Sequence, residues 1–279
     1  MKTGITILCD NYIAASGLVG EHGFALMIER GEEKLLFDTG PGLSLPMNLD
    51  FLEKDLENLS AVSLSHGHYD HTGGLKWVVE QTGKVEVVAH PAVFEKHLKH
   101  NSPDSGGPPR YIGCPCSREE LEALGATFRF VDQTTRIRPG LWFVTGIHRN
   151  PDRFPRDARL VRPQGDELVL DPIEDDSSIL LETDEGPLLV LGCAHAGLLN
   201  ILDHLRTEMG IDRLRGVLGG THLMFYGPES LAVAIDELEK FSIPFIGVSH
   251  CTGIRAMIEL SKHFGGRFVP ASAGSVFEF

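Results

Sequence analysis

The chain has 279 residues, 42% of them hydrophobic, and a formal charge of −14 at pH 7. This length and apolar content suffice for the core of a globular enzyme, whereas the acidic surface would repel a nucleic-acid backbone. The five cysteines form no repeating framework, so a disulfide scaffold is not expected. No apolar run is long enough for a membrane span or a signal peptide. We therefore expect a cytoplasmic protein that binds neither nucleic acid nor a membrane.

Strands and helices are expected to alternate along the chain, because apolar residues recur with a period of two in some segments and with helical spacing in others. In the first half, strands are predicted at 4–10, 24–28, 34–37, 61–64, 84–89, 127–131 and 141–145, and helices at 47–56, after Gly74, and from Ser117 to Gly125. In the second half, strands are predicted at 178–183, 188–191, 216–218 and 245–248, and helices at 198–209, 229–241 and 254–263. The helix at Ser117 begins with a capping box, Ser117 to Glu120.

One segment, residues 95–118, departs from this alternation. It contains Asn-Ser-Pro-Asp-Ser-Gly-Gly-Pro-Pro, which is turn chemistry without periodicity and too long for an ordinary connection. We interpret it as an insertion or lid loop, and Arg110 and Tyr111 as candidates for the wall of a substrate pocket. The alternative is a solvated loop with no functional role.

The strongest chemical signal is a cluster of three histidines and one aspartate directly behind an expected strand. His66 and His68 are two residues apart, so in extended backbone both rings point to one side. Asp70 and His71 follow and can face a second point close by. Imidazole and carboxylate suit Zn, Fe or Mn, and a structural zinc site would normally use more thiolate. The cluster therefore predicts a catalytic site for two metal ions.

Each of the last three expected strands ends in polar residues that include a histidine, namely His195, His222 and His250. Sites in α/β layers form where the carboxyl ends of strands open, so these histidines can meet the first cluster there. The glycines before His222 allow a close approach of backbone to a ligand. The remaining histidines on polar faces and loops are expected at the surface: His90, His97, His100, His204 and His263.

The cluster, together with Asp38-Thr39-Gly40 at an expected strand end, resembles the metallo-β-lactamase superfamily. Further segments are similar to one branch, the dihydropteroate-synthase-like or methanopterin-biosynthesis-type metal-dependent hydrolases: 21–24, 192–197, 219–223 and 250–253. This resemblance implies an α/β fold, a four-layer αββα sandwich, formed by residues 1–279 as a single domain.

The resemblance also implies roles for individual residues. One metal ion would be held by His66, His68 and His195, and the other by Asp70, His71 and His250. Asp38 would orient a ligating imidazole through its free N–H, and His222 would act on substrate as an electrophile or proton donor. Cys193 stands where many superfamily members have an aspartate that bridges both metals, so it could ligate one metal or contact substrate.

Three functions are consistent with these residues. The first is a hydrolase in which two divalent ions, zinc or else iron or manganese, activate water against an ester, lactone, phosphoester or amide of a small molecule. The second is a pterin-linked synthase acting on a phosphorylated heterocycle, with the region of Arg110 holding an anionic group. The third is a binding or sensing module that retains metal without turnover.

Overall fold

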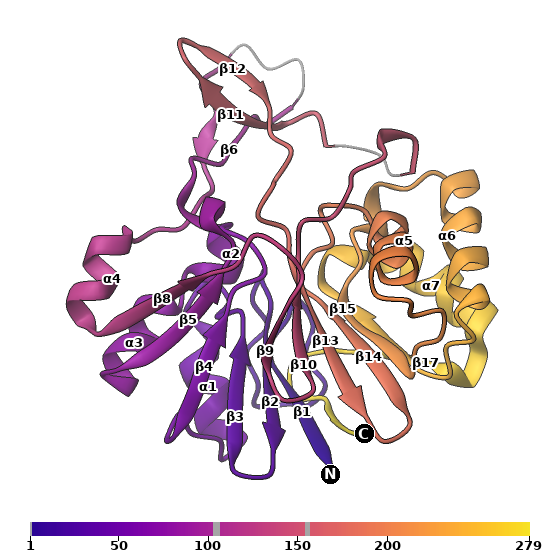
Figure 1. The fold of residues 1–279 in the computed structure, drawn as a ribbon, viewed down its shortest axis with the longest axis horizontal. Coiled ribbons are helices and arrows are strands. Elements are labelled where there is room, and N and C mark those ends of the chain that lie inside the picture. Colours follow the sequence, from indigo (N-terminus) through magenta and orange to yellow (C-terminus); the bar gives the residue numbers. More distant parts are fainter. Residues whose placement is uncertain (1, 103–106, 154–156) are drawn as a thin grey trace.

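Two large sheets face each other in the middle of the molecule. The computed structural model describes residues 2–102, 107–153 and 157–279. Within these ranges the chain forms two seven-stranded sheets and one four-stranded sheet. Helices cover the outer face of each large sheet (Figure 1). This arrangement confirms the expected four-layer αββα sandwich.

The first large sheet is built by the N-terminal half of the chain and by the last strand. In spatial order its strands are β18 (Val276–Glu278), β1 (Thr3–Cys9), β2 (Ala25–Arg30), β3 (Glu33–Phe37), β4 (Leu59–Ser63), β5 (Val85–Ala89) and β8 (Ala126–Phe130). Its helices are α1 (Ser44–Phe51), α2 (Tyr69–Thr72), α3 (Leu75–Thr82) and α4 (Arg118–Leu124). Strands β3, β4, β5 and β8 run parallel, so their carboxyl ends meet at one edge.

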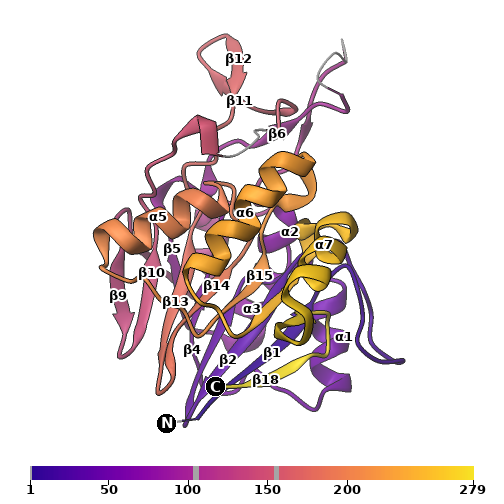
Figure 2. The same ribbon diagram turned by 90° about the vertical axis from the view of Figure 1, so that its right-hand side faces the viewer.

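The second large sheet is built from later residues of the chain and is also covered by helices on its outer face. Its order is β17 (Phe268–Pro270), β16 (Ile246–Ser249), β15 (Gly216–Gly220), β14 (Gly186–Leu191), β13 (Ser178–Thr183), β10 (Leu141–Val144) and β9 (Thr135–Arg138). Its outer face is covered by α5 (Leu198–Glu208), α6 (Pro228–Lys240) and α7 (Ile254–Phe264), which Figure 2 shows in front of the strands. Strands β14, β15 and β16 are parallel.

The core lies in three layers, one between the sheets and one under each helical layer. Alternation along β2 shows how the sequence divides them: Leu26 and Ile28 pack between the sheets, whereas Met27 packs against the helices of the first half. Each large apolar side chain that is fully buried contributes roughly 1.5–3 kcal/mol relative to exposure. The shared layer between the sheets fixes them to each other, so that their strand ends keep a constant geometry.

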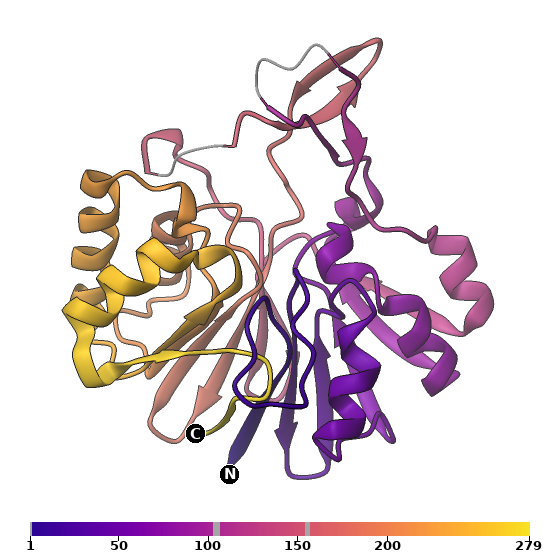
Figure 3. The ribbon, with the colours of Figure 1, turned by 180° about the vertical axis from the view of Figure 1, so that it is seen from behind.

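The four-stranded sheet stands apart from the sandwich, at the end opposite both termini (Figures 1 and 3). Its order is β12 (Glu167–Leu170), β11 (Leu160–Gln164), β6 (Leu98–Lys99) and β7 (Arg110–Tyr111). Two of these short strands come from the segment expected to be an irregular loop, where Lys99 pairs with Arg110. Residues 103–106 of that segment lie outside the described part of the chain.

Most expected elements are present with ends shifted by a few residues. The largest shift is in α1, expected at 47–56, which begins at Ser44 and ends at Phe51. Short 3-10 helices complete the structure: η1 (Pro91–Phe94), η2 (Pro151–Arg153), η3 (Leu223–Phe225), η4 (His250–Thr252) and η5 (Gly265–Arg267). No helix in the described ranges is long and apolar enough to cross a membrane.

Candidate metal centre

The predicted site residues meet at the edge where the parallel strands of both sheets end. They are Asp38 after β3, the segment 66–71 after β4, Cys193 and His195 after β14, His222 after β15, and His250 at the end of β16. Residues from strands more than a hundred positions apart in sequence are therefore placed within a few ångströms of one another. The packed inter-sheet core makes this possible.

His66, His68 and His195 form the first candidate metal group. One nitrogen from each lies within 4.8 Å of the others, and Nε2 of His66 is 3.0 Å from Nδ1 of His68. Burial, with a smaller effect from neighbouring histidines, lowers the pKa of all three well below 6.5. The rings are therefore neutral and keep a free lone pair. Nε2 of His195 is buried without a hydrogen-bond partner in the described residues, which fits a metal ligand.

Asp70, His71 and His250 form the second candidate group, again with ligand atoms within 4.8 Å. His71 Nδ1 donates to Oδ2 of Asp38 at 2.7 Å, which leaves Nε2 free to face a metal. Burial lowers the pKa of His71, but the charge and hydrogen bond of Asp38 outweigh it and raise the pKa to about 9. Asp38 is fully buried and also accepts from the backbone N–H and hydroxyl of Ser65. The expected hydrogen bond from an imidazole to Asp38 is thus present.

Cys193 lies between the two groups. Its Sγ is 3.2 Å from Nε2 of His71 and 3.2 Å from Nε2 of His250. It also falls within 4.8 Å of ligand atoms of His66 and of His195 in two further combinations. A thiolate at this position could reach metal ions held by either group. Many superfamily members have an aspartate that bridges both metals at the corresponding position.

Several site residues adopt backbone conformations that side chains rarely take. φ is 59° at Asp38, 56° at Ala194, 57° at His222 and 51° at His250. Each of these left-handed residues lies at or just after the end of a strand that leads into the site. Such conformations cost of order 1 kcal/mol or more each and persist only where surrounding packing imposes them. Their concentration here indicates that the site's geometry is maintained at the expense of local stability.

His222 occupies a different position from the two groups. Its ring centroid lies 4.4 Å from that of His195 and 4.9 Å from that of Phe225. Its Nδ1 is buried without a hydrogen-bond partner in the part of the chain that the structure describes. One of its nitrogens is also within 4.8 Å of ligand atoms of Cys193 and His195. His222 can therefore act either on a metal or on a molecule bound beside it.

A cavity of about 250 Å³ opens over these groups. Its lining includes His68, Asp70, Cys193, His195, His222 and His250 at the metal groups, and Lys99, Arg110, Asp157 and Arg159 from the region of the small sheet. Tyr111 is not part of this lining, and its hydroxyl donates to the carbonyl of Cys114. Because neighbouring residues on a strand point to opposite sides, only Arg110 of this pair faces the cavity. A contact of Tyr111 with substrate stays a prediction.

A family model decides the assignment of the fold, since the Metallo-beta-lactamase superfamily model matches residues 18–250. The chain belongs to the metallo-beta-lactamase superfamily. The superfamily predicted from the histidine cluster is thereby confirmed, and the divalent metal binding typical of this fold agrees with the two groups.

This superfamily member is also similar, over most of its length, to individual proteins. The 7,8-dihydropterin-6-methyl-4-(beta-D-ribofuranosyl)-aminobenzene-5'-phosphate synthase of Methanocaldococcus jannaschii is 26% identical, covering 93% of this chain and 90% of its own. The crystal structure of Tm1679, a metal-dependent hydrolase of the beta-lactamase superfamily, aligns with a TM-score of 0.84 and 26% identity over 99% of both chains. The metallo-beta-lactamase fold protein YhfI from Bacillus subtilis shares the fold, with a TM-score of 0.57, 13% identity and 99% coverage of both chains.

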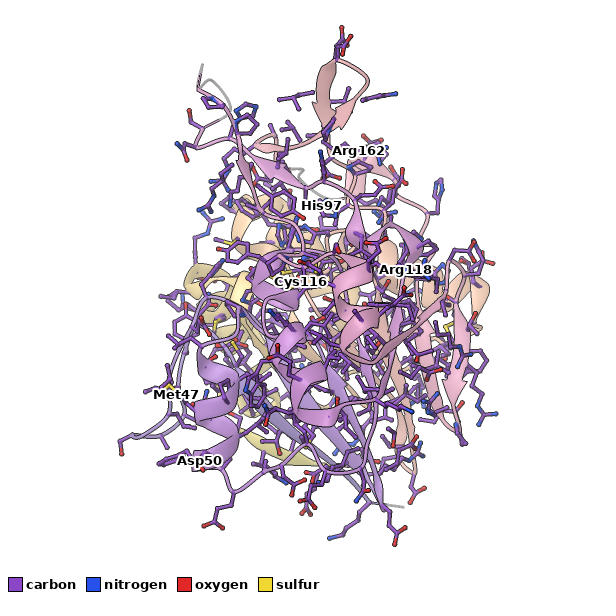
Figure 4. All side chains as sticks on the ribbon, turned by 90° about the vertical axis from the view of Figure 1, so that its left-hand side faces the viewer. Met47, Asp50, His97, Cys116, Arg118 and Arg162 are labelled. Atoms are coloured by element: carbon purple, nitrogen blue, oxygen red, sulfur yellow. The ribbon has the colours of Figure 1, made fainter. Side chains whose placement is uncertain are left out.

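The sequence analysis missed one buried histidine beside the metallo-beta-lactamase site. His97 was expected at the surface, but only 2% of it is exposed, and its ring lies 5.1 Å from that of His68. Its Nδ1 donates to Asp171 at 2.7 Å, and its Nε2 is 3.7 Å from Asp175. Asp175 also accepts from the backbone N–H of Gly67, inside the histidine cluster. Figure 4 shows His97 between the small sheet and the sandwich.

Asn11 and His22 are further contacts of the second metal group. Oδ1 of Asn11 lies 3.0 Å from Nδ1 of His250, which fixes the orientation of that ring and directs Nε2 towards the site. His22 Nε2 is 3.5 Å from Oδ2 of Asp70, although 66% of the His22 side chain is exposed. The turn Asp10-Asn11-Tyr12 was recognisable in the sequence as a strand end, but nothing in its spacing linked it to His250.

Proposed function

We propose that the chain is a hydrolase that uses two divalent metal ions, with zinc as the resident metal and iron or manganese as alternatives, against a small molecule. One observation carries this proposal: two separate groups of buried ligand atoms meet around Cys193 on the floor of a cavity. His66, His68 and His195 would hold one ion, and Asp70, His71 and His250 the other. A cavity of about 250 Å³ suits a small molecule and not a polymer.

When bound, the two ions would lower the pKa of water from about 15.7 towards about 7 and polarise the ester, lactone, phosphoester or amide oxygen of the substrate. The chain's own residues supply the rest. Asp38 holds the ring of His71 in one orientation, and Asn11 does the same for His250. His222 lines the cavity beside His195, where it would stabilise a developing oxyanion or protonate the leaving group.

The proposal extends to the organisation of the molecule. Residues 1–279 would act as one domain, with the segment 95–118 as an insertion or lid loop. The cytoplasm would be its location, as expected from the sequence.

The test begins with elemental analysis of anaerobically purified protein, followed by a screen over phosphoesters, lactones and pterins. We expect two metal equivalents per chain and turnover of one substrate class that disappears when a chelator removes the metal. Full metal loading without turnover on any class would instead favour a binding module that retains metal.

A synthase reaction on a phosphorylated heterocycle is the second candidate, because one relative at 26% identity over 93% of this chain is a synthase. The two reactions differ in the origin of the product's atoms. Hydrolysis in water enriched in oxygen-18 places labelled oxygen in the product, whereas a synthase yields a product that contains both substrates. Mass spectrometry of the product therefore decides between them.

A further inference from the structure

Three cationic side chains from the region of the small sheet line the cavity together with the metal groups: Lys99 from β6, Arg110 from β7, and Arg159 just before β11. We call these three residues the cationic rim. They gather because of strand pairing. Lys99 is directly opposite Arg110, and Leu160, the residue after Arg159, is opposite Lys99. The backbone N–H of His100 also donates to the carbonyl of Arg159 at 2.9 Å.

One member of the cationic rim is held in place by an acid. Arg159 donates to both carboxylate oxygens of Asp157, at 2.8 Å from Nε and 2.6 Å from Nη2. Its guanidinium also lies over the ring of Phe225, 5.7 Å from the ring centre. A bidentate ion pair and an aromatic contact restrict the guanidinium to one position, which reduces the conformational entropy lost when it binds a ligand.

The other two cations have no such partner. Within residues 2–102, 107–153 and 157–279, neither Lys99 nor Arg110 forms an ion pair with a carboxylate. Lys99 is half-buried, and its pKa is lowered first by that burial and then by the neighbouring charges of Arg159 and Arg110. Asp157 and Asp70 also line the cavity, and Asp70 belongs to the second metal group. Within the rim itself, three positive charges therefore face the one negative charge of Asp157, an excess of two. This excess stands at the mouth of a cavity in a chain whose formal charge is −14.

The like charges of half-buried Lys99, exposed Arg110 and half-buried Arg159 repel one another, so this arrangement does not stabilise the free protein. An anion bound among them would relieve the repulsion and satisfy the donors. An excess of two positive charges matches a phosphate monoester, which carries about −1.5 to −2 at neutral pH and three acceptor oxygens. A nucleic-acid backbone fits less well, because the surface is acidic overall and the cavity is small.

We infer that the cationic rim binds a terminal phosphate monoester of the substrate, which anchors the molecule while a different bond lies at the metal groups. This inference rests on the proposed function and specifies its substrate class. Phe225 and His222 also line the cavity, with ring centroids 4.9 Å apart. Their rings would contact the bound substrate.

The test measures binding of inorganic phosphate to the metal-loaded protein by isothermal titration calorimetry. The double variant Lys99→Gln, Arg110→Gln is compared with the wild type. Loss of a charge-assisted hydrogen bond should weaken phosphate binding by about 10-fold or more per removed cation. Phosphate bound directly to metal is common to both proteins, so the difference between them reports the cationic rim.

Arg162→Gln is the matched control. Arg162 lies on β11 of the same small sheet (Figure 4), where it pairs with Glu95 at 3.0 Å and Glu174 at 3.4 Å, and it does not line the cavity. This variant should bind phosphate like the wild type. Metal content measured in all three proteins shows whether the metal groups are intact.

The outcomes separate the inference from the proposed function. Equal phosphate affinity in the wild type and the double variant would overturn the inference, even if the protein hydrolyses a substrate. Acetate binding as tight as phosphate, with the same sensitivity to the double variant, would overturn the assignment to phosphate in favour of a carboxylate. Phosphate binding that depends on the rim, in a protein without turnover, would support the inference and contradict the hydrolase proposal.

Discussion

His222 differs from the six histidine and aspartate residues of the two metal groups in what surrounds it. Those six would provide three ligands for each ion, and His222 lies beside them with its Nδ1 unpaired within the described residues. Its φ of 57° projects the ring from the end of β15 towards the cavity. A side chain placed in this way can interact with charge that develops on a substrate.

We predict that His222→Asn keeps the metal content and the fold and lowers kcat by about 10²- to 10⁴-fold, because a proton donor or oxyanion partner is lost. His204→Asn is the control, since His204 is half-buried on α5 and contacts Thr134 outside the cavity. If His222→Asn instead loses one metal equivalent, His222 is a ligand. Unchanged kcat would mean that His222 has no part in the reaction.

His97 should make the stability of the fold depend on pH. Burial lowers its pKa, but the hydrogen bond to Asp171 and the negative charges of Asp171 and Asp175 outweigh burial and raise the pKa from 6.5 to about 10. The folded protein therefore retains a proton that the unfolded chain releases above pH 6.5. The contribution of this proton to the free energy of unfolding is complete below pH 6.5 and is lost as the pH rises through about 10. Its size is about 1.4 kcal/mol for each unit by which the pKa differs between the folded and unfolded chain.

The variant His97→Gln should thus flatten the fall in unfolding free energy between pH 6.5 and 10. Urea unfolding at several pH values measures the slope, with His100→Gln as the control. An equally steep slope in His97→Gln and the wild type would show that His97 does not carry the extra proton.

Candidate site residues were easiest to recognise where the side chains that act together are close in the sequence. The ligands in 66–71 fall within one loop, so their spacing alone indicated two metal sites. His97 was missed because its carboxylate partners lie far along the chain, with Asp171 74 positions away. Its neighbours Lys96, Lys99 and His100 are polar, which is the pattern of an exposed segment.

At the scale of elements, the start of a helix was predicted correctly where the residues that cap it are close together in the sequence. In α4, Ser117 accepts from the N–H of Glu120, and the Glu120 carboxylate accepts from the N–H of Ser117, as the capping box predicts. The two-residue strands β6 and β7 could not be predicted in this way. They pair with each other, and β6 also pairs with β11, which is distant in sequence, whereas two-residue sequences carry no period.

We predict that Ser117→Ala destabilises the fold by about 1 kcal/mol, because one N–H of the first turn of α4 loses its acceptor. Metal content should not change, since α4 packs on the first sheet away from the strand ends that carry the ligands (Figure 1). Thermal or urea unfolding together with metal analysis measures both effects. Loss of metal in this variant would show that α4 is coupled to the site.

At the scale of the molecule, the order of strands and helices in the sequence was enough to predict alternating layers of helices and strands, and the resemblance to the superfamily implied the αββα sandwich. The sequence could not show how closely the two sheets bring their strand ends together. That depends on the inter-sheet core, in which residues such as Ile5, Phe37 and Leu188 pack across the interface. The sequence could not show the cationic rim either, because its three residues are brought together only by the pairing of strands in the small sheet.

The central claim is that each metal group holds its own ion. His68 belongs to the first group and Asp70 to the second, although they are only two residues apart. Substitution of a residue that only hydrogen-bonds to a ligand typically lowers metal affinity 10- to 100-fold. Removal of a ligand itself should lower metal affinity by more than this.

Metal stoichiometry of the wild type, His68→Ala and Asp70→Ala, measured by mass spectrometry of metals, tests this most directly. We predict two equivalents per chain in the wild type and one in each variant. Unchanged stoichiometry in both variants, or a single equivalent in the wild type, would contradict the dinuclear site.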